Sequence, residues 1–187
     1  MGKIVVTEFI SLDGVVEGPG GEDFKYPDWS FEVDRGPEGE RFKELEALGA
    51  SALLLGRKTY EGFAEAWPQY EGELADKYNA MPKYVVSRTL TDPEWNNTTV
   101  LSGDLVEEVS RLKAEVDGEI SVAGSIQLAQ SLIADDLVDE IRLMTSPLIL
   151  GHGRTLWAET PDKTAWELSE ATTYGDGVLL TILQRAR

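Results

Sequence analysis

The sequence predicts one α/β domain over residues 1–187, with a mixed, mostly parallel sheet, helices on both faces and a C-terminal antiparallel hairpin. Three observations predict this class. Short apolar segments alternate with helical patterns through most of the chain. The run Ala50–Leu55 is apolar throughout, which is typical of a parallel strand buried on both faces. Finally, Gly175-Asp176-Gly177 separates two strand-like segments, which indicates a hairpin.

The composition excludes several classes of protein. Acidic residues number 34 and basic residues 17, giving a formal charge of −17, which argues against nucleic-acid binding. The absence of cysteine removes disulfides and thiol chemistry, and no histidine spacing suggests a metal site. No apolar run is long enough to span a membrane, and the N-terminus lacks a signal-peptide pattern, so we expect a soluble cytoplasmic protein. An anionic ligand would need a local cluster of cations.

The first strand is expected over Lys3–Leu12 and is followed by a sharp turn at Asp13-Gly14. Asp13 could bond a substrate or cap this turn. The glycine-dense loop Glu17–Gly21 could be a flap over a ligand or a flexible connection. The aromatic residues of the next segment, 24–36, could wall a pocket or cover the core.

A first helix is expected from Pro37 to Gly49, with Phe42, Leu45 and Leu48 on its apolar face. The buried strand Ala50–Leu55 follows it.

That buried strand leads into the stretch that carries the strongest functional signal. Gly56, Arg57, Lys58 and Thr59 stand between the strand and a second helix. A helix N-terminus already favours an anion, and Arg57 and Lys58 would add charge to it. The stretch therefore predicts either a phosphate-binding site or an ordinary strand–turn–helix whose cations are solvated.

Two further strand ends carry similar groups. After a short helix and a third strand, Lys83–Val86, come Ser87, Arg88 and Thr89. After a strand at Glu119–Ala123 come Gly124 and Ser125, with Ser125 as the expected cap of the next helix. This second glycine junction could seat a phosphate or be an ordinary capped helix.

Other elements follow from local signals. A short strand is expected at Thr98–Leu101, and Asp104 with Glu107 forms a capping box before another helix. Pro147 suits a bulge or an edge of the sheet. His152, the only histidine, stands between two glycines, which is more typical of a turn residue than of a catalytic base.

Together these segments resemble the dihydrofolate reductase-like superfamily, in the branch related to the reductase domain of the bifunctional riboflavin-biosynthesis deaminase/reductase. Five motifs carry the resemblance in the family's order: Ser11–Gly14, Leu55–Glu61, Val86–Leu90, Val122–Ser125, and Leu137–Glu140 running to Pro147 and Gly151–Gly153.

The resemblance implies NADPH as the cofactor, hydride transfer to a small-molecule substrate, and a homodimer. It places Gly56, Arg57, Lys58 and Thr59 over the cofactor's phosphates. It also places Ser87, Arg88 and Thr89 near the adenosine 2′-phosphate, and Gly124, Ser125 and Ile126 at the pyrophosphate.

The substrate and the proton donor are less well determined. The resemblance implies a ribosylaminopyrimidine-type or other small heterocyclic substrate. The alternatives are a non-catalytic NADP(H)-binding domain and dihydrofolate reductase proper. Asp13 and Glu38 are the candidate acids, although Glu38 could equally be an exposed residue that stabilises the helix dipole.

Overall fold

The computed structural model describes residues 1–20, 23–160 and 162–186, and within these ranges it contains one eight-stranded sheet. The strand order is β4-β3-β2-β5-β1-β6-β8-β7. The strands are β1 (Lys3–Ser11), β2 (Ala52–Gly56), β3 (Lys83–Val86), β4 (Thr98–Leu101), β5 (Glu119–Ala123), β6 (Glu140–Ser146), β7 (Trp166–Tyr174) and β8 (Val178–Arg185). The helices are α1 (Gly36–Gly49), α2 (Arg57–Ala66), α3 (Glu73–Ala80), α4 (Leu105–Glu115) and α5 (Ile126–Ala134), with short 3₁₀ turns η1 (Trp29–Phe31) and η2 (Trp67–Gln69).

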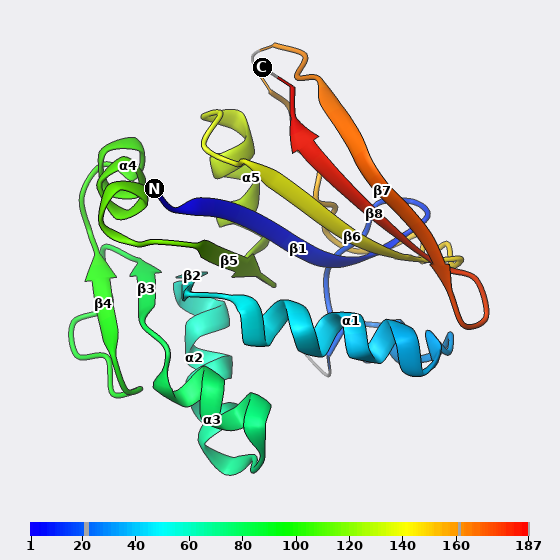
Figure 1. Ribbon diagram of the computed structural model, residues 1–187, viewed down its shortest axis with the longest axis horizontal. Helices are drawn as coiled ribbons and strands as arrows, with labels where there is room; N and C mark the ends of the chain where they lie inside the picture. The colour runs from blue at the N-terminus through cyan, green and yellow to red at the C-terminus, as the bar shows by residue number, and fades with distance from the viewer. Residues whose placement is uncertain (21–22, 161, 187) are drawn as a thin grey trace.

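This architecture confirms the predicted fold class. The six strands from β1 to β6 pair in parallel, and β8 then runs antiparallel to both β6 and β7. Figure 1 shows β3, β4 and α4 at one side of the molecule and the β7–β8 hairpin at the other. Pro147 lies just beyond the end of β6, outside the ladder, because it cannot donate a ladder hydrogen bond.

The parallel pairing brings the carboxyl ends of the strands to one edge of the sheet. Gly56 at the end of β2 pairs with Val86 at the end of β3, and Ser11 at the end of β1 pairs with Ser146 at the end of β6. Ala123, which ends β5, pairs with Thr7 of β1. The loops that carry the predicted functional residues therefore leave the sheet along the same edge.

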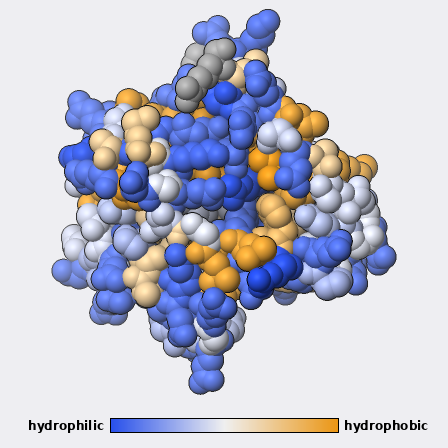
Figure 2. All heavy atoms as spheres, in the orientation of Figure 1, coloured by the Kyte–Doolittle hydropathy of each residue, from blue (hydrophilic) through white to orange (hydrophobic). Residues whose placement is uncertain are grey.

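The two faces of the sheet are covered in different ways. Alternate residues of β1, among them Ile4, Val6 and Ile10, join the main apolar core with residues of α4 and α5. Fully burying one such aliphatic side chain contributes about 1.5–3 kcal/mol. The opposite residues of β1, Thr7 and Phe9, face α1, and hydrophilic residues cover most of the surface on that side (Figure 2).

Under α1 the sheet carries a network of charges. Arg142 donates to Glu140 and Glu119, both at 2.7 Å, and lies 3.5 Å from Glu46 of α1. Lys3 donates to Glu140 at 2.5 Å. Burial opposes ionisation of Glu140, but the hydrogen bond from Lys3 and the charge of Arg142 outweigh it and lower its pKa. The ionised groups therefore stay charged in a largely buried layer.

This polar layer corrects the predicted apolar face of α1. Leu45 is 51% exposed, while Phe42 and Leu48 are only half-buried. Lys43 and Glu46 face the sheet instead, and each contacts the Thr7 hydroxyl, at 2.8 and 2.9 Å. Phe42 packs against the apolar cluster of Met144, Val178 and Leu180, as expected, but the charged residues Lys43 and Glu46 share the inward face.

Candidate functional site

A cleft of about 710 Å³ lies along the carboxyl edge of the sheet between the N-termini of α2 and α5. Seven of the predicted cofactor-binding residues line it: Gly56, Arg57, Lys58, Thr59, Gly124, Ser125 and Ile126. Two of the three predicted junctions therefore share one groove.

Two reciprocal hydrogen bonds join these junctions. The Gly56 N–H donates to the Ser125 hydroxyl at 2.9 Å, and the Thr59 hydroxyl donates to the Gly124 carbonyl at 3.0 Å. Gly124 has φ +64° and lies against the Thr59 side chain, so a larger residue there would be strained. The starts of α2 and α5 are thus held side by side.

The predicted capping role of Ser125 is wrong, and the reason is this cross-link. Ser125 is the N-cap residue of α5, but its side chain caps no N–H of that helix because it accepts from Gly56. The start of α2, at Gly56, also lacks a side-chain cap. By contrast, the Asp104 carboxylate caps α4 by accepting from the backbone N–H groups of Val106 and Glu107. The first turns of α2 and α5 therefore keep N–H groups for an anion.

Arg57 connects this cleft to the third junction. Its Nε donates to Glu61 at 2.7 Å, and one terminal nitrogen donates to the Thr89 hydroxyl at 2.7 Å. Ser87 is buried, and its hydroxyl accepts from the backbone N–H groups of Thr89 and Leu90. Ser87, Arg88 and Thr89 are not among the described residues of the cleft wall, but Val86 directly before them is, so this junction borders the site through Val86 and through the Thr89 contact.

Sequence reasoning missed one cation that lines the cleft. Arg154, from the loop after β6, lines the cleft and binds the carboxylate of Glu17 through both its backbone N–H and its Nε, at 2.9 Å each. The available signal was a cation directly after a glycine, as at Arg57, although here in a loop well beyond the end of the strand.

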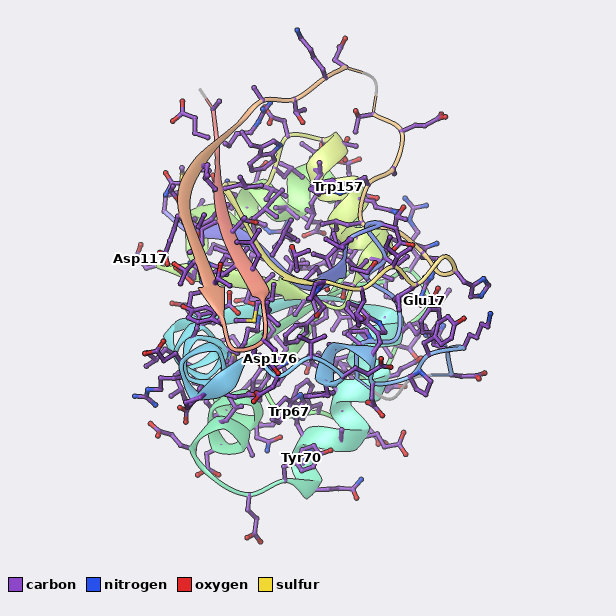
Figure 3. All side chains as sticks on the ribbon, turned by 90° about the vertical axis from the view of Figure 1, so that its right-hand side faces the viewer. Glu17, Trp67, Tyr70, Asp117, Trp157 and Asp176 are labelled. Carbon is purple, nitrogen blue, oxygen red and sulfur yellow. The ribbon has the colours of Figure 1, made fainter. Side chains whose placement is uncertain are left out.

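In its described part, the loop that begins at Glu17 is held by hydrogen bonds. The Glu17 carbonyl accepts from the Trp29 indole at 2.8 Å, and the Pro19 carbonyl accepts from Ser30 at 2.7 Å. Figure 3 shows Glu17 on the side of the molecule opposite Asp117. Gly21, the last residue of the predicted flap, lies outside the described residues.

The two candidate acids do not line the cleft. Asp13 accepts from the Ser11 hydroxyl and from the N–H groups of Leu150 and Gly151, at 2.6, 3.1 and 2.8 Å. These hydrogen bonds, that of Ser11 foremost, lower the pKa of Asp13 to about 2, so it is ionised at neutral pH and ties two loops together. Glu38 is exposed in the first turn of α1, where it matches the dipole-stabilising alternative.

The part of the chain that the structure describes gives no support to histidine or metal chemistry or to a membrane-spanning helix. His152 is exposed and stacks on Phe24, with ring centroids 6.0 Å apart. No three His, Asp or Glu side chains among the described residues are grouped as metal ligands. Across the described ranges, no helix has both the length and the apolar character of a membrane span.

The strand order and the cleft at the strand ends define the class of this protein, an α/β domain with the dihydrofolate reductase-like fold. A family model described as the RibD C-terminal domain matches residues 2–180, and the chain belongs to this family.

Individual relatives agree with the family assignment. The uncharacterized protein YyaP of Bacillus subtilis (strain 168) is 26% identical, with 95% of this chain and 92% of YyaP covered. YwjB of the same organism, also uncharacterized, is 25% identical, with 95% of each chain covered.

Two solved structures share the fold. A Shewanella sp. PV-4 protein assigned provisionally to riboflavin biosynthesis superimposes with a TM-score of 0.80 at 22% identity, covering 99% of both chains. A pyrimidine reductase-like protein from Corynebacterium diphtheriae gives a TM-score of 0.64 at 12% identity, covering 99% of this chain and 92% of its own.

Proposed function

We propose that this protein is an NADPH-dependent oxidoreductase that reduces a small heterocyclic substrate of the ribosylaminopyrimidine type. The observation that carries the proposal is the pair of uncapped helix N-termini, cross-linked through Gly56 and Ser125, with Arg57 and Lys58 in the same cleft. On a molecule with a net charge of −17, such a site favours an anionic ligand specifically at this edge. Membership in the RibD C-terminal domain family supports a reductase.

The cleft suits the phosphates of a dinucleotide. The N–H groups at the starts of α2 and α5 would hold the pyrophosphate, since neither is occupied by a side-chain cap. Arg57, held between Glu61 and Thr89, would bind the 2′-phosphate. When bound, NADPH supplies the hydride, and the chain contributes binding and orientation.

Water is the proposed source of the proton. Asp13 is ionised and fully engaged with neighbouring loops, and Glu38 lies outside the described cleft wall. Neither acid is therefore placed to donate a proton to a ligand in the cleft.

The test is a fluorescence titration with NADPH, followed by single-turnover oxidation of the bound cofactor. We expect micromolar or tighter binding, and oxidation when 5-amino-6-(5-phosphoribosylamino)uracil is added. Dihydrofolate should give no oxidation, and methotrexate should fail to bind. If NADPH does not bind, the proposal is wrong.

A second candidate is an NADP(H)-binding domain without turnover. It is favoured by the positions of Asp13 and Glu38, because the cleft lacks the acid that the resemblance led us to expect there. Tight NADPH binding without oxidation by either substrate would support this alternative.

We also propose that the protein forms a homodimer through its C-terminal strands. Leu168 of β7 and Leu179 of β8 are 60% and 39% exposed, and β7 is an edge strand. Sedimentation velocity should show a dimer that Leu168→Glu weakens; a monomer at all concentrations would contradict it.

A further inference from the structure

Three Asp-Gly dipeptides occur in the sequence, at Asp13-Gly14, Asp117-Gly118 and Asp176-Gly177. The aspartate of each one is exposed in the structure. In such a dipeptide the glycine nitrogen can attack the aspartate side chain, because glycine carries no Cβ to hinder the approach. The same short sequence therefore offers one covalent reaction at three places, and the fold decides where it proceeds.

At two of these places the glycine N–H is held in a hydrogen bond. Gly14 donates to the Ser11 carbonyl at 3.0 Å, and Gly177 donates to the Tyr174 carbonyl at 3.1 Å. The Asp13 carboxylate is held as well, since it accepts hydrogen bonds from a hydroxyl and from two backbone N–H groups. A turn fixed in this way must first open before the glycine nitrogen can reach the carboxyl carbon.

The Asp117-Gly118 turn, which joins α4 to β5, lacks this protection. In the part of the chain that the structure describes, the Gly118 N–H makes no hydrogen bond. The Asp117 side chain is 99% exposed, and its ion pair with the N-terminal amine, at 3.1 Å, is itself exposed and restrains it weakly. Because the turn precedes β5, it lies at the amino edge of the sheet, away from the cleft.

We propose that Asp117 is a site of spontaneous isoaspartate formation in the folded protein. The Gly118 nitrogen forms a bond to Cγ of Asp117, and its proton leaves with the carboxyl hydroxyl as water, which gives a cyclic succinimide. A water molecule then opens the ring. Breaking the bond between the nitrogen and Cγ restores aspartate, whereas breaking the bond to the main-chain carbonyl carbon gives isoaspartate, in which the backbone runs through the side chain.

This product would lengthen a turn that anchors the start of β1. The Gly2 N–H donates to the Lys113 carbonyl at 2.6 Å, before the turn, and the Lys3 N–H donates to the Gly118 carbonyl at 2.9 Å, within it. Isoaspartate inserts one backbone carbon between these two acceptors. We therefore expect the modified protein to have a Tm about 2–4 °C lower, the shift for the loss of about one hydrogen bond.

The test is incubation of the folded protein for several weeks at physiological temperature and neutral pH, followed by peptide mapping. Peptides that contain isoaspartate are recognised by methylation with a protein isoaspartate methyltransferase and by their separation from aspartate peptides of the same mass. We expect conversion at Asp117 to be at least about tenfold faster than at Asp13 or Asp176, the factor that one protecting hydrogen bond is worth. Calorimetry of the converted fraction measures the change in Tm.

The same chain in guanidinium chloride is the matched control. Unfolding removes the hydrogen bonds that protect Asp13 and Asp176, so the three dipeptides should then convert at similar rates. Asp117→Glu in the folded protein should abolish the fast conversion, because its side chain would have to close a larger ring, and should leave the other two positions unchanged.

Two results would overturn the proposal. One is conversion at Asp117 that is no faster than at Asp13 and Asp176 in the folded protein. The other is conversion at Asp117 in guanidinium chloride but not in the folded protein, since the fold would then protect this turn too. An unchanged Tm of the converted protein would contradict the predicted effect on β1.

Discussion

Two clefts flank α2, and they differ in charge. The cleft described above is lined by Arg57, Lys58 and Arg154. The other, of about 770 Å³, has four carboxylates in its wall and, among its described lining residues, no lysine or arginine: Glu61, Glu65, Asp92 and Glu94 lie around Tyr60 and Trp95. Glu61 belongs to both walls. Cavity volume therefore does not identify the anion-binding site, whereas the helix N-termini and the cations do.

Among the variants that test this difference between the two clefts, Arg57→Ala should have the largest effect. Loss of a charge-assisted contact to a phosphate should weaken NADPH binding by about 10- to 100-fold in a fluorescence titration. Arg111→Ala, which removes an exposed arginine of α4, should leave the affinity unchanged. Equal losses in both variants would mean that overall charge, rather than this cleft, attracts the cofactor.

Ser125→Ala tests whether the cationic cleft depends on its cross-link. The Gly56 N–H would lose its acceptor in a partly buried site, so unfolding free energy should fall by about 1–3 kcal/mol in urea titrations. Ser110→Ala, at an exposed position of α4, is the control and should cost less than about 0.5 kcal/mol. An unchanged stability for Ser125→Ala would contradict the structural role of this bond.

Glu61→Gln tests the wall that the clefts share. Glutamine can still accept from Arg57 but carries no charge, so repulsion of a bound phosphate falls and NADPH should bind about two- to fivefold more tightly. Glu65→Gln, one turn further along α2, touches only the acidic cleft and should have no effect. Titration of both variants decides whether the effect is local.

The smallest expected effect concerns the pH dependence of the Glu17–Arg154 pair. Since the folded pKa of Glu17 is lowered from 4.5, its stabilisation is complete above pH 4.5 and is lost as pH falls through the folded pKa. Glu17→Gln should therefore lower the free energy of unfolding by about 0–1 kcal/mol at neutral pH, and by less at acidic pH. Urea unfolding of the wild type and the variant at neutral and acidic pH measures this loss. A loss that grows at acidic pH would contradict the assignment.

Local sequence signals predicted most of the fold. Strands β3, β4 and β5 have the expected bounds, because a bounded apolar or alternating segment defines each one locally. The N-cap role of Asp104 was likewise readable, since its carboxylate accepts from N–H groups only two and three positions away.

The errors arose where distant partners decide the outcome. Leu45 is exposed because the sheet presents charges to α1, and Ser125 bonds Gly56, 69 residues away, instead of its own helix. Arg154 is held at the site by Glu17, 137 residues distant in sequence, and by the N–H of Val16, which donates to its carbonyl. Such contacts leave no periodicity in the sequence, so only the folded structure reveals them.

The position of β1 has a consequence for synthesis of the chain. Its neighbours in the sheet are β5 and β6, and Lys3 pairs with Glu119. At translation rates of about 5–20 residues per second, the first strand waits on the order of ten seconds for both partners. During that interval Ile4, Val6 and Ile10 have no sheet to join, so nascent chains are expected to need a chaperone until β6 has left the ribosome.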